Sequence, residues 1–469
     1  MEKSKATIIS YTGEPERICT AAARVSTTAG SVTEIFEKTG QSNDFTLIPK
    51  VLSMGHVTFI EHVNFTIAFE NVSAFVEQFM IEFRLAAFTI KSRRYVDFSK
   101  MGYFVPDMQF DKEISEDRKN AVIEKYHQYI QHLFSDYASF VKDGVPKEDA
   151  RFILPYCYRS NFYCSANARE LMHIIFSAIN GRGRKHQEIY KLGLSLLEQC
   201  KEIAPNIFNS LDSLEKGSDD KEIRLRKLNM NISSRNNNTQ NIELISYTTN
   251  PENLVAATAI MNHTGCTFDS AKGILKKDKK IYKDVIGVII EDKRNRELEQ
   301  INFTFRINNL SFAGLTHLTR HRIQNLVVPS FVEAGSSEYH IIPKSLKDNE
   351  ALYKKYEGIW GQHAEMLKCF EEAGVRKEDL AYLYLSGNVV NVTTTMNGRE
   401  LFHFIKLRTC NRAQWEIREY AISMLLELRK VAPDIFMSAG PSCVLSGECP
   451  EGKLTCGKIK EVKRKFKEN

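Results

Sequence analysis

In the second half of the sequence two arginines flank a histidine, and an apolar run leads from them to a serine. Arg320, His321 and Arg322 form the basic triplet, and Ser330 ends the run. One interpretation is a basic helix end, because cations stabilise the C-terminus of a helix. The alternative is a ligand site, since two guanidinium groups around an imidazole suit a ligand with several anionic or carbonyl groups, such as a dinucleotide. We expect the two arginines on different faces of a helix, because they are two residues apart.

The first half of the chain has a different set of polar residues at the same distance after a similar segment. Glu82 and Phe83 stand before Arg84, so the Arg-His pair is missing. Residues 92–95, however, read Ser-Arg-Arg-Tyr. A hydroxyl and a planar guanidinium group bind phosphate well. The two halves therefore carry different parts of one polar motif.

These residues lie at corresponding positions of a tandem repeat. The segment ISYTGEPE at 9–16 returns as ISYTTNPE at 245–252, and NFTIAFENVS at 64–73 returns as NFTFRINNLS at 302–311. Three shorter segments also return in the same order and at nearly the same offset. Such self-similarity indicates duplication of one module of roughly 215 residues. Two copies of one fold in a single chain usually pack as a pseudo-dimer.

The repeat predicts the domain boundaries. We place the first module at 1–214, a polar linker at 215–242, the second module at 243–456 and a basic tail at 457–469. The linker is poor in large apolar residues, which is typical of an exposed connecting segment. The two modules are expected to share one fold.

Each module is predicted to be α+β, with more helix than strand. Alternation of apolar and polar residues predicts a strand at 64–71, and a helical pattern follows from Val72 to Arg84. Apolar residues near helical spacing predict a long amphipathic helix at 113–142. Residues 158–166 are strand-like, and another helix begins within NARELMHIIFSA at 167–178.

Composition and charge favour an ordinary globular protein without a membrane span or a nucleic-acid partner. Hydrophobic residues make up 43% and charged residues 26%, which is usual for globular domains. The formal charge is +6, but six basic and two acidic residues fall in 457–469, so the remainder is nearly neutral. This argues against a large nucleic-acid-binding surface. The run VIGVII at 285–290 is at most a buried strand and is too short to span a bilayer, and the N-terminus lacks the apolar core of a signal peptide.

Ten cysteines are scattered through the sequence. This usage is typical of reduced thiols, so we expect a cytoplasmic protein. Cys443, Cys449 and Cys456 are spaced C-x5-C-x6-C near the C-terminus. Three thiolates are one short of a structural zinc site, and the spacings differ from the usual C-x2-4-C. We expect a loop end without a metal there and keep a metal as the alternative.

Several segments resemble those of the flavin-dependent thymidylate synthases. RHRIQNLVVPS at 320–330 is similar to the family's RHR-x7-S signature. GHVTFIEHVNFTIAFENVSAFVEQF at 55–79 and SRRYVDF at 92–98 look like the stretch around that signature. NAREL at 167–171, NGREL at 397–401, AQWEIR and CPEGKLTCG also resemble family segments. The resemblance covers both modules almost end to end.

The resemblance implies a fold, an assembly, a cofactor and a reaction. The fold is two tandem copies of helices packed around a small mixed or antiparallel sheet. The family assembly is a homotetramer, so we expect this two-module chain to be a homodimer that forms a pseudo-tetramer. The cofactor is FAD, and the reaction converts dUMP to dTMP with methylenetetrahydrofolate as carbon source and NADPH as reductant. No cysteine nucleophile is needed, and the Pro-Cys-His motif of classical thymidylate synthases is absent from the sequence.

The resemblance also implies roles for individual residues. In the family, Arg-His-Arg and nearby residues hold the flavin, and the loop ending in Ser-x-Arg-Tyr holds the nucleotide. The flavin-binding residues would be Arg320, His321, Arg322, His56, Asn167, Arg169, Asn397, Arg399 and His403. The nucleotide-binding residues would be Gln78, Ser92, Arg94, Tyr95, Arg151, Ser330 and Arg408. Arg408 and Arg320 are the expected catalytic residues, since they would polarise the uracil carbonyl groups.

Each module has lost what the other keeps. The second module has Val332 in place of the nucleotide-loop arginine and Ala381 where the first has Arg151. The first module has Ala178 at the position of Arg408. Sites shared by two subunits allow each copy to lose the half that its partner supplies. We therefore predict composite sites, with the nucleotide loop from the first module and Arg-His-Arg and Arg408 from the second.

Both modules also depart from the family between Arg-His-Arg and the serine. The family has polar or acidic residues there, whereas the first module has Thr89 and Ile90 and the second has Val327 and Val328. Two alternatives to the family reaction therefore stay open. One is a catalytically inactive paralogue that binds flavin or nucleotide. The other is a related enzyme that alkylates another pyrimidine nucleotide.

Overall fold

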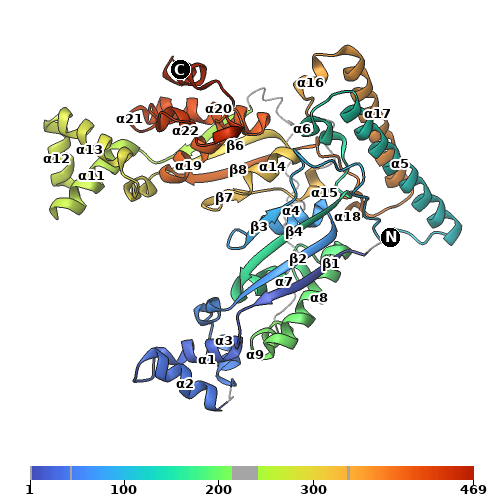
Figure 1. Cartoon of the computed structure of the whole chain (residues 1–469), viewed down its shortest axis with the longest axis horizontal. Helices are drawn as coiled ribbons and strands as arrows, with labels where there is room; N and C mark the ends of the chain where they lie inside the picture. Colours follow the sequence, from blue (N-terminus) through green and yellow to red (C-terminus); the bar gives the residue numbers. More distant parts are fainter. Residues whose placement is uncertain (1–2, 43–44, 214–240, 335–338, 469) are drawn as a thin grey trace. The chain divides into compact units, whose positions relative to one another are not determined.

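The computed structural model describes residues 3–42, 45–213, 241–334 and 339–468 (Figure 1). They form two compact units whose boundaries differ from those of the repeats. The first unit combines the described residues up to 235 with Ile342–Gly387, and the second combines those of 236–341 with 388–469. Most of the predicted linker lies outside the described residues. The predicted module boundaries therefore stay a prediction about the repeats.

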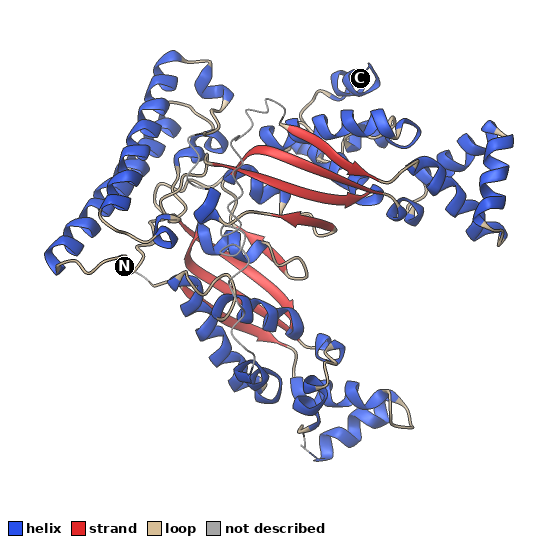
Figure 2. Ribbon diagram, turned by 180° about the vertical axis from the view of Figure 1, so that it is seen from behind, coloured by secondary structure: helices blue, strands red, loops and turns tan. Residues whose placement is uncertain are grey.

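Each unit contains one four-stranded antiparallel sheet, drawn red in Figure 2. The strand order is β1-β2-β4-β3 in the first unit and β5-β6-β8-β7 in the second. The strands are β1 (Lys5–Tyr11), β2 (Asn64–Ser73), β3 (Ala87–Ile90), β4 (Arg159–Asn167), β5 (Ile242–Tyr247), β6 (Asn302–Ser311), β7 (Gln324–Val327) and β8 (Val389–Asn397). Asn64 pairs with Asn167, and Asn302 pairs with Asn397 in the same register. The repeat thus encodes one sheet twice, which confirms the α+β fold class.

Alternating side chains give each sheet a buried face. On β2, Phe65, Ile67 and Phe69 are buried, and because successive side chains point to opposite faces they lie on one side. In the first unit α7 (Ala168–Ile179) and α8 (Gln187–Ile203) pack on the sheet, and in the second α19 (Gly398–Arg408) and α20 (Trp415–Val431) do so. The opposite faces keep exposed apolar side chains, among them Tyr163 (54% exposed) and Val327 (64% exposed).

The remaining helices surround these cores. Those built from the first repeat are α1 (Pro15–Val25), α2 (Val32–Ser42), α3 (Leu47–Ser53), α4 (Ala74–Ile81), α5 (Glu116–Lys142), α6 (Lys147–Ala150) and α9 (Pro205–Phe208). Those in the second unit are α11 (Pro251–Thr264), α12 (Phe268–Lys277), α13 (Lys279–Glu291), α14 (Phe312–Leu318), α15 (Phe331–Ala334), α21 (Pro433–Phe436), α22 (Ser442–Leu445) and α23 (Ile459–Glu468). None of the described helices is long and apolar enough to cross a membrane.

Side-chain caps fix where the site-bearing helices begin. Ser73 Oγ accepts the N–H of Val76 at 3.2 Å at the start of α4. Asn167 and Asn397 accept backbone N–H groups in the same way at the starts of α7 and α19. Such caps satisfy donors that a helix leaves unpaired at its first turn. Each cap is the last residue of a strand, so these helices start directly at the end of the sheet.

The segment Ile342–Gly387 of the second repeat belongs to the first unit. It carries α16 (Lys344–Lys347), α17 (Glu350–Glu372) and α18 (Lys377–Leu380). The long helix α17 packs along α5, as Figure 1 shows. Tyr129 Oη on α5 lies 2.7 Å from His363 Nδ1 on α17. The second repeat therefore supplies part of the core of the first unit.

Two predictions about elements are wrong. Residues 285–290, expected to be a strand, lie within α13, where the buried side chains Ile286 and Ile289 are three residues apart as on one helix face. The helix expected from Val72 begins at Ala74, because Val72 still pairs with Ser160 in the sheet. A short apolar run fits a strand or a helix equally well, and only its neighbours decide.

Candidate active site

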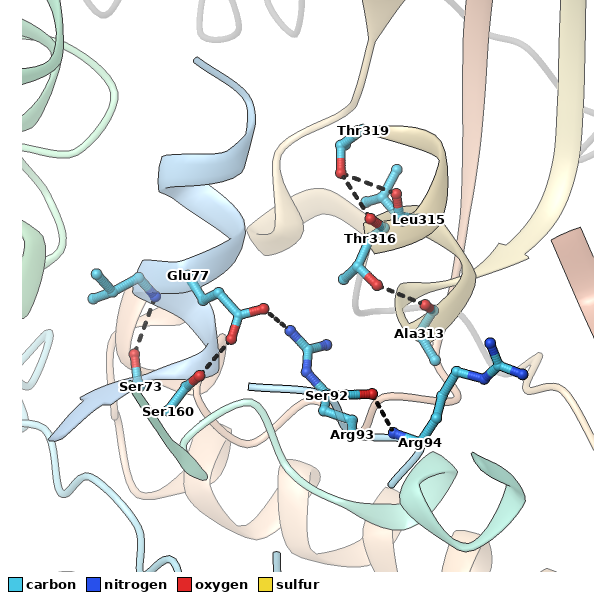
Figure 3. A network of polar contacts seen from close by, with 11 residues as sticks. Ser73, Glu77, Ser92, Arg93, Arg94, Ser160, Ala313, Leu315, Thr316 and Thr319 are labelled. Carbon is cyan, nitrogen blue, oxygen red and sulfur yellow. Dashed lines mark hydrogen bonds and ion pairs between the residues drawn. The ribbon is translucent and has the colours of Figure 1, made fainter. Parts of the chain in front are cut away.

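Three arginines gather in the first unit, and we call Arg93, Arg94 and Arg151 the arginine cluster. Arg93 is buried in the loop after β3, and its Nη2 forms an ion pair with Glu77 Oε1 on α4 (Figure 3). Ser160 Oγ donates to the other oxygen of Glu77 at 2.6 Å. Burial alone would lower the pKa of Arg93, but the Glu77 carboxylate raises it above its ordinary value. Arg93 therefore stays charged although it is buried.

Arg94 and Arg151 both contact Glu148. Arg94 Nε donates to Glu148 Oε2 at 2.8 Å, and Arg151 Nε donates to the backbone carbonyl of Glu148 at 3.0 Å. Burial and the neighbouring Arg93 lower the pKa of Arg151 to about 10, which leaves it charged at neutral pH. Within the cluster, three guanidinium groups face the two carboxylates of Glu77 and Glu148. Guanidinium groups gathered in this way suit an anionic ligand.

One donor nitrogen of the cluster is buried without a partner among the described residues. Nη1 of Arg93 makes no hydrogen bond within the described part of the chain. An unsatisfied buried donor costs about 1–3 kcal/mol.

The other nucleotide residues predicted in the first repeat differ in their surroundings. Ser92 begins the loop, and its Oγ accepts the N–H of Arg94 at 3.3 Å. Tyr95 is 64% exposed, and the Arg94 guanidinium carbon lies 5.7 Å from the centre of its ring. Gln78 is buried on α4, and its Nε2 donates to Glu82 Oε1 at 3.1 Å. Ser92 and Tyr95 therefore adjoin the arginine cluster, whereas Gln78 is engaged by Glu82.

In the first repeat, Glu82 and Phe83 occupy the positions of the Arg-His pair. Arg182 forms an ion pair with Glu82, and its guanidinium carbon lies 4.6 Å from the centre of the Phe79 ring. Phe83 is buried, and its ring meets that of His173 edge-on at 5.2 Å. Glu82 and Phe83 thus have their contact partners within the first repeat itself.

The second unit carries a chain of three polar side chains, Glu400, His321 and Arg408, which we call the histidine relay. Arg408 Nε donates to His321 Nε2 at 2.9 Å, and His321 Nδ1 lies 3.0 Å from Glu400 Oε1. Because Nε2 accepts, Nδ1 carries the proton and donates to Glu400. Burial lowers the pKa of His321 and Arg408 acts in the same direction, although Glu400 opposes them. A neutral imidazole therefore orients the Arg408 guanidinium.

Arg320 and Arg322 are exposed on either side of the buried His321. Their predicted place on a helix is wrong, because α14 ends at Leu318 and the basic triplet forms the turn before β7. The N–H of His321 donates to the carbonyl of Leu318 at 3.1 Å, a bond that tightens the end of a helix. The two arginines diverge from the turn instead of from a helix surface.

The nucleotide-loop positions of the second repeat are apolar. Phe331 corresponds to Arg93, and its ring stacks on Phe312 with centroids 4.2 Å apart and planes at 8°. Leu315 corresponds to Glu77 and is buried. The buried ion pair of the first unit is thus replaced by apolar packing. Each unit keeps one of the two polar groups, the arginine cluster or the histidine relay.

Sequence comparison decides the family of this chain. The family model described as "Thymidylate synthase complementing protein" matches residues 7–206 and 243–434. The chain belongs to the thymidylate synthase complementing protein family. The match in both halves confirms the resemblance seen in the sequence, with two divergent copies of the family module in tandem.

The curated relatives of this chain are about half its length. The flavin-dependent thymidylate synthase of Geobacter sulfurreducens is 36% identical over 231 residues, which cover 48% of this chain and 98% of that protein. The flavin-dependent thymidylate synthase of Clostridium tetani is 34% identical over 243 residues, which cover 48% and 95%. Among solved structures, a UMP/dUMP methylase PolB from Streptomyces cacaoi, bound with 5-Br dUMP, aligns with 46% of this chain and 97% of its own length, at 20% identity and a TM-score of 0.39.

Two arginines in the family's NAREL and NGREL segments are held by acidic side chains. Arg169 Nη1 pairs with Glu61 Oε1 at 2.5 Å in the first unit. Arg399 Nη1 pairs with Glu299 Oε1 at 2.5 Å in the second. The two pairs are equivalent, so this contact is a feature of the module. Contacts from these arginines to a flavin stay a prediction.

The remaining candidate residues of this family member lie in ordinary environments. Asn167 and Asn397 cap helices through their side-chain oxygens. His56 and His403 are exposed, and Ser330 is half-buried just before α15. Their predicted roles in binding stay predictions.

Two carboxylates of the site were missed in the sequence, Glu77 and Glu400. Glu77 gave a usable signal, because it interrupts the apolar segment AFVEQFMI, in which all eight residues are buried. A carboxylate in such a helix needs a buried cationic partner. Glu400 gave no such signal in the sequence, because an acidic residue in the first turn of a helix is common for electrostatic reasons alone.

Proposed function

We propose that this protein is a flavin-dependent thymidylate synthase, which converts dUMP to dTMP with methylenetetrahydrofolate and NADPH through FAD. The observation that carries the proposal is the division of polar groups between the repeats. The first unit keeps the arginine cluster, and the second keeps the histidine relay. Free decay would not spare opposite halves of one site. The names of the curated relatives support the same activity.

In this proposal the arginine cluster binds the phosphate of the nucleotide. Arg94 and Arg151 supply positive charge, and Ser92 supplies a hydroxyl donor. Arg93 is a positioning residue, because its pair with Glu77 fixes the loop that presents Arg94. Three guanidinium groups at one place favour a phosphate dianion over a neutral ligand.

The histidine relay would act at the uracil ring. Arg408 and Arg320 would donate hydrogen bonds to the uracil carbonyl oxygens and stabilise negative charge that develops there. His321 is neutral and accepts the Nε–H of Arg408, which fixes the orientation of that guanidinium group. Glu400 holds the imidazole in the tautomer that this requires.

The residues of the second unit also suit an anionic dinucleotide. Arg320 and Arg322 are exposed, and the side chain of Arg399 is 43% exposed. Guanidinium groups that remain accessible can bind the pyrophosphate of FAD. When bound, the flavin would supply hydride transfer in the reductive step. Arg322 is the residue that we expect to hold it most directly, and the buried His321 would act by fixing the turn that presents Arg322.

A specific observation favours a second candidate function. Ile90 and Val328 are apolar at the position where the family has an acidic residue. An inactive paralogue that binds flavin or nucleotide, or an enzyme acting on another pyrimidine nucleotide, would tolerate that loss. The complementary division of polar groups favours the first function, because an inactive paralogue has no need of it.

Release of tritium from dUMP labelled at C5 would test the proposal. The purified chain is incubated with FAD, NADPH and methylenetetrahydrofolate, each also omitted in turn. Release that requires all three supports the proposed reaction. Bound flavin without release supports the inactive paralogue, and release from UMP but not from dUMP supports another pyrimidine substrate. Arg408→Ala is the inactive control, and Val332→Ala is the control for an equivalent position that lacks a polar group.

We further propose a cytoplasmic homodimer that forms a pseudo-tetramer of four modules. The exposed apolar side chains on the open sheet faces, including Tyr163 and Val327, support an association that covers them. Folate and nucleotide are the expected small-molecule partners. Neither a nucleic acid nor a membrane is part of the proposal.

A further inference from the structure

Four cysteines of the second unit line one small cavity. Cys410 follows α19, Cys443 lies on α22, and Cys449 and Cys456 lie in the loops between α22 and α23. The cavity has a volume of about 50 Å³ and is lined by all four side chains. Cys443 is close enough to each of the other three to interact with it electrostatically. Four thiols from two separate parts of the chain therefore meet at one place.

Cys410 lies outside the C-x5-C-x6-C pattern of the other three cysteines. The spacing C-x5-C-x6-C contains three thiols, but Cys410 comes 33 positions before Cys443 and is brought to the others by the fold. Four thiolates are the complete ligand set of a structural zinc site. The first repeat has Asn180 at the position of Cys410, so the cluster belongs to the second repeat alone.

The surroundings of the cluster suit thiolates. The backbone N–H of Arg412 donates to Cys410 Sγ at 3.5 Å, and Asn411 Nδ2 donates to Cys456 Sγ at 3.8 Å. Lys406, Arg412 and Glu451 also line the cavity. A divalent ion with four thiolates carries a net charge of about −2, and the two cations, less the carboxylate of Glu451, would offset part of it. N–H donors to sulfur stabilise the same charge and fix the ligand orientation.

The thiol groups of the cluster are near one another but do not form a finished coordination shell. In the described parts of the chain, no three Cys, His, Asp or Glu side chains already stand at metal-coordinating positions, and all ten cysteines are free thiols. Cys449 and Cys456 lie on a segment that turns at Gly447, Gly452 and Gly457, each with a positive φ. Neither Cys449 nor Cys456 lies in a helix or strand, although the short 3-10 helix Gly452–Leu454 lies between them, so the loop backbone can adjust to bring their thiols around an ion.

We propose that Cys410, Cys443, Cys449 and Cys456 bind one Zn²⁺ ion as a closed structural site. Binding replaces the four thiol protons with four zinc–sulfur bonds and releases those protons to solvent, with no change in oxidation state. The ion joins the loops before α23 to the end of α19. Since Cys410 is two residues after Arg408, the site holds the end of the helix that carries the histidine relay.

Zinc content of the full chain tests the proposal. The chain is expressed without a metal-binding tag, purified with a thiol reductant and without chelator, and analysed by elemental mass spectrometry. We expect about one zinc per chain, a loss of most of it in Cys449→Ser and Cys456→Ser, and no loss in Cys266→Ser. Cys266 is the matched control, because it is a half-exposed thiol of the same unit outside the cluster. Zinc absent from the wild type, or equally present in all variants, would overturn the proposal.

Cobalt substitution keeps the test valid if a variant fails to fold. Metal-free wild-type chain is titrated with Co²⁺, and we expect the intense visible bands and sulfur-to-cobalt charge-transfer absorption of a tetrahedral thiolate site. The weak bands of octahedral oxygen coordination would contradict the proposal. So would a disulfide within the cluster, seen as two thiols that react with a maleimide under denaturing conditions only after reduction. Flavin content is recorded separately, because the zinc site stands whether or not the proposed catalytic function does.

Discussion

Arg408 Nε donates a hydrogen bond of 2.9 Å to His321 Nε2, and the opposite nitrogen of this imidazole faces Glu400. The three side chains come from two segments that are about 80 residues apart in sequence, the turn after α14 and the helix α19. The buried imidazole is therefore a connection between the basic triplet and the helix that carries Arg408. A substitution of His321 is therefore expected to affect both the basic triplet and Arg408.

His321→Phe places in the second repeat the residue that the first repeat has at this position. It removes the acceptor of Arg408 and leaves the buried Glu400 without its donor, which costs about 1–3 kcal/mol of unfolding free energy. We expect loss of tritium release and of bound flavin, with the fold retained. Urea denaturation and flavin absorbance measure the two effects. Phe83→Leu is the control in the first repeat, and equal loss of flavin in both variants would contradict the assignment.

The ion pair of Glu77 and Arg93 is expected to behave as a unit. Arg93→Ala leaves an uncompensated carboxylate at a fully buried position, and we expect the unfolding free energy to fall by about 3–5 kcal/mol. The double variant Glu77→Leu, Arg93→Phe installs the apolar residues that the second repeat has there. It should be more stable than either single variant, because a buried ion pair can be replaced by apolar packing at little cost. A double variant less stable than Arg93→Ala in urea denaturation would be evidence against this view.

Nucleotide binding should depend on one repeat only. Arg94→Ala removes a charge-assisted contact to phosphate, for which we expect a loss of about 1.5–3 kcal/mol in binding free energy. Val332→Ala changes the equivalent position of the second repeat and should leave the affinity unchanged. Calorimetric titration of dUMP into both variants gives the comparison. The same loss in both would show two symmetric sites and refute the composite site.

We expect the buried His186 to lower the free energy of unfolding in mild acid. Burial lowers its pKa from 6.5 to about 4, so between these values the unfolded chain binds a proton that the folded chain does not. The free energy of unfolding should therefore fall as the pH is lowered from about 6.5 to 4, by up to about 3 kcal/mol for this group. The contribution is the difference between the wild type and His186→Gln, measured by urea denaturation across this range. A difference that does not vary with pH would show that His186 does not titrate as expected.

The predicted homodimer can be tested by measuring the mass of the protein in solution. A pseudo-tetramer of four modules requires two chains, and light scattering should give twice the chain mass of 53.7 kDa. Tyr163→Glu places a charge on an open sheet face, where a second copy would bury it at a large cost. We expect it to favour the monomer, with Tyr11→Glu at the sheet edge as a comparison. A wild type that scatters as one chain at all concentrations would refute the dimer.

The repeat made the fold largely predictable, but contacts between distant segments were not. The segment at 64–73 and its copy at 302–311 correctly indicated the central strands of both sheets. The assignment of 342–387 to the first unit depends on packing between α5 and α17. Helical periodicity predicts an amphipathic helix but not the helix against which it packs. Residues 285–290 form part of a helix and not the expected strand. The length of an apolar segment alone does not separate strand from helix.

The candidate site was predictable by residue type and not by geometry. Arg93 was noted only as a neighbour of Arg94, yet the structure pairs it with Glu77 on another element. His321 was expected between two arginines on a helix, whereas it is buried in a turn against Glu400. Cys410 could not be counted with the other cluster thiols, because only the fold brings them together.

Because Ile342–Gly387 completes the first unit, a ribosome must translate as far as residue 387 of 469 before that unit can close. At roughly 5–20 residues per second, the first repeat waits on the order of 10 s after its own end has been synthesised. During this time the surface of α5 that α17 later covers, including Tyr129, meets water or a chaperone. A premature stop between the repeats would release a first repeat whose helix α5 lacks the cover that α17 provides. In this structure the first unit is therefore complete only once most of the second repeat has been synthesised.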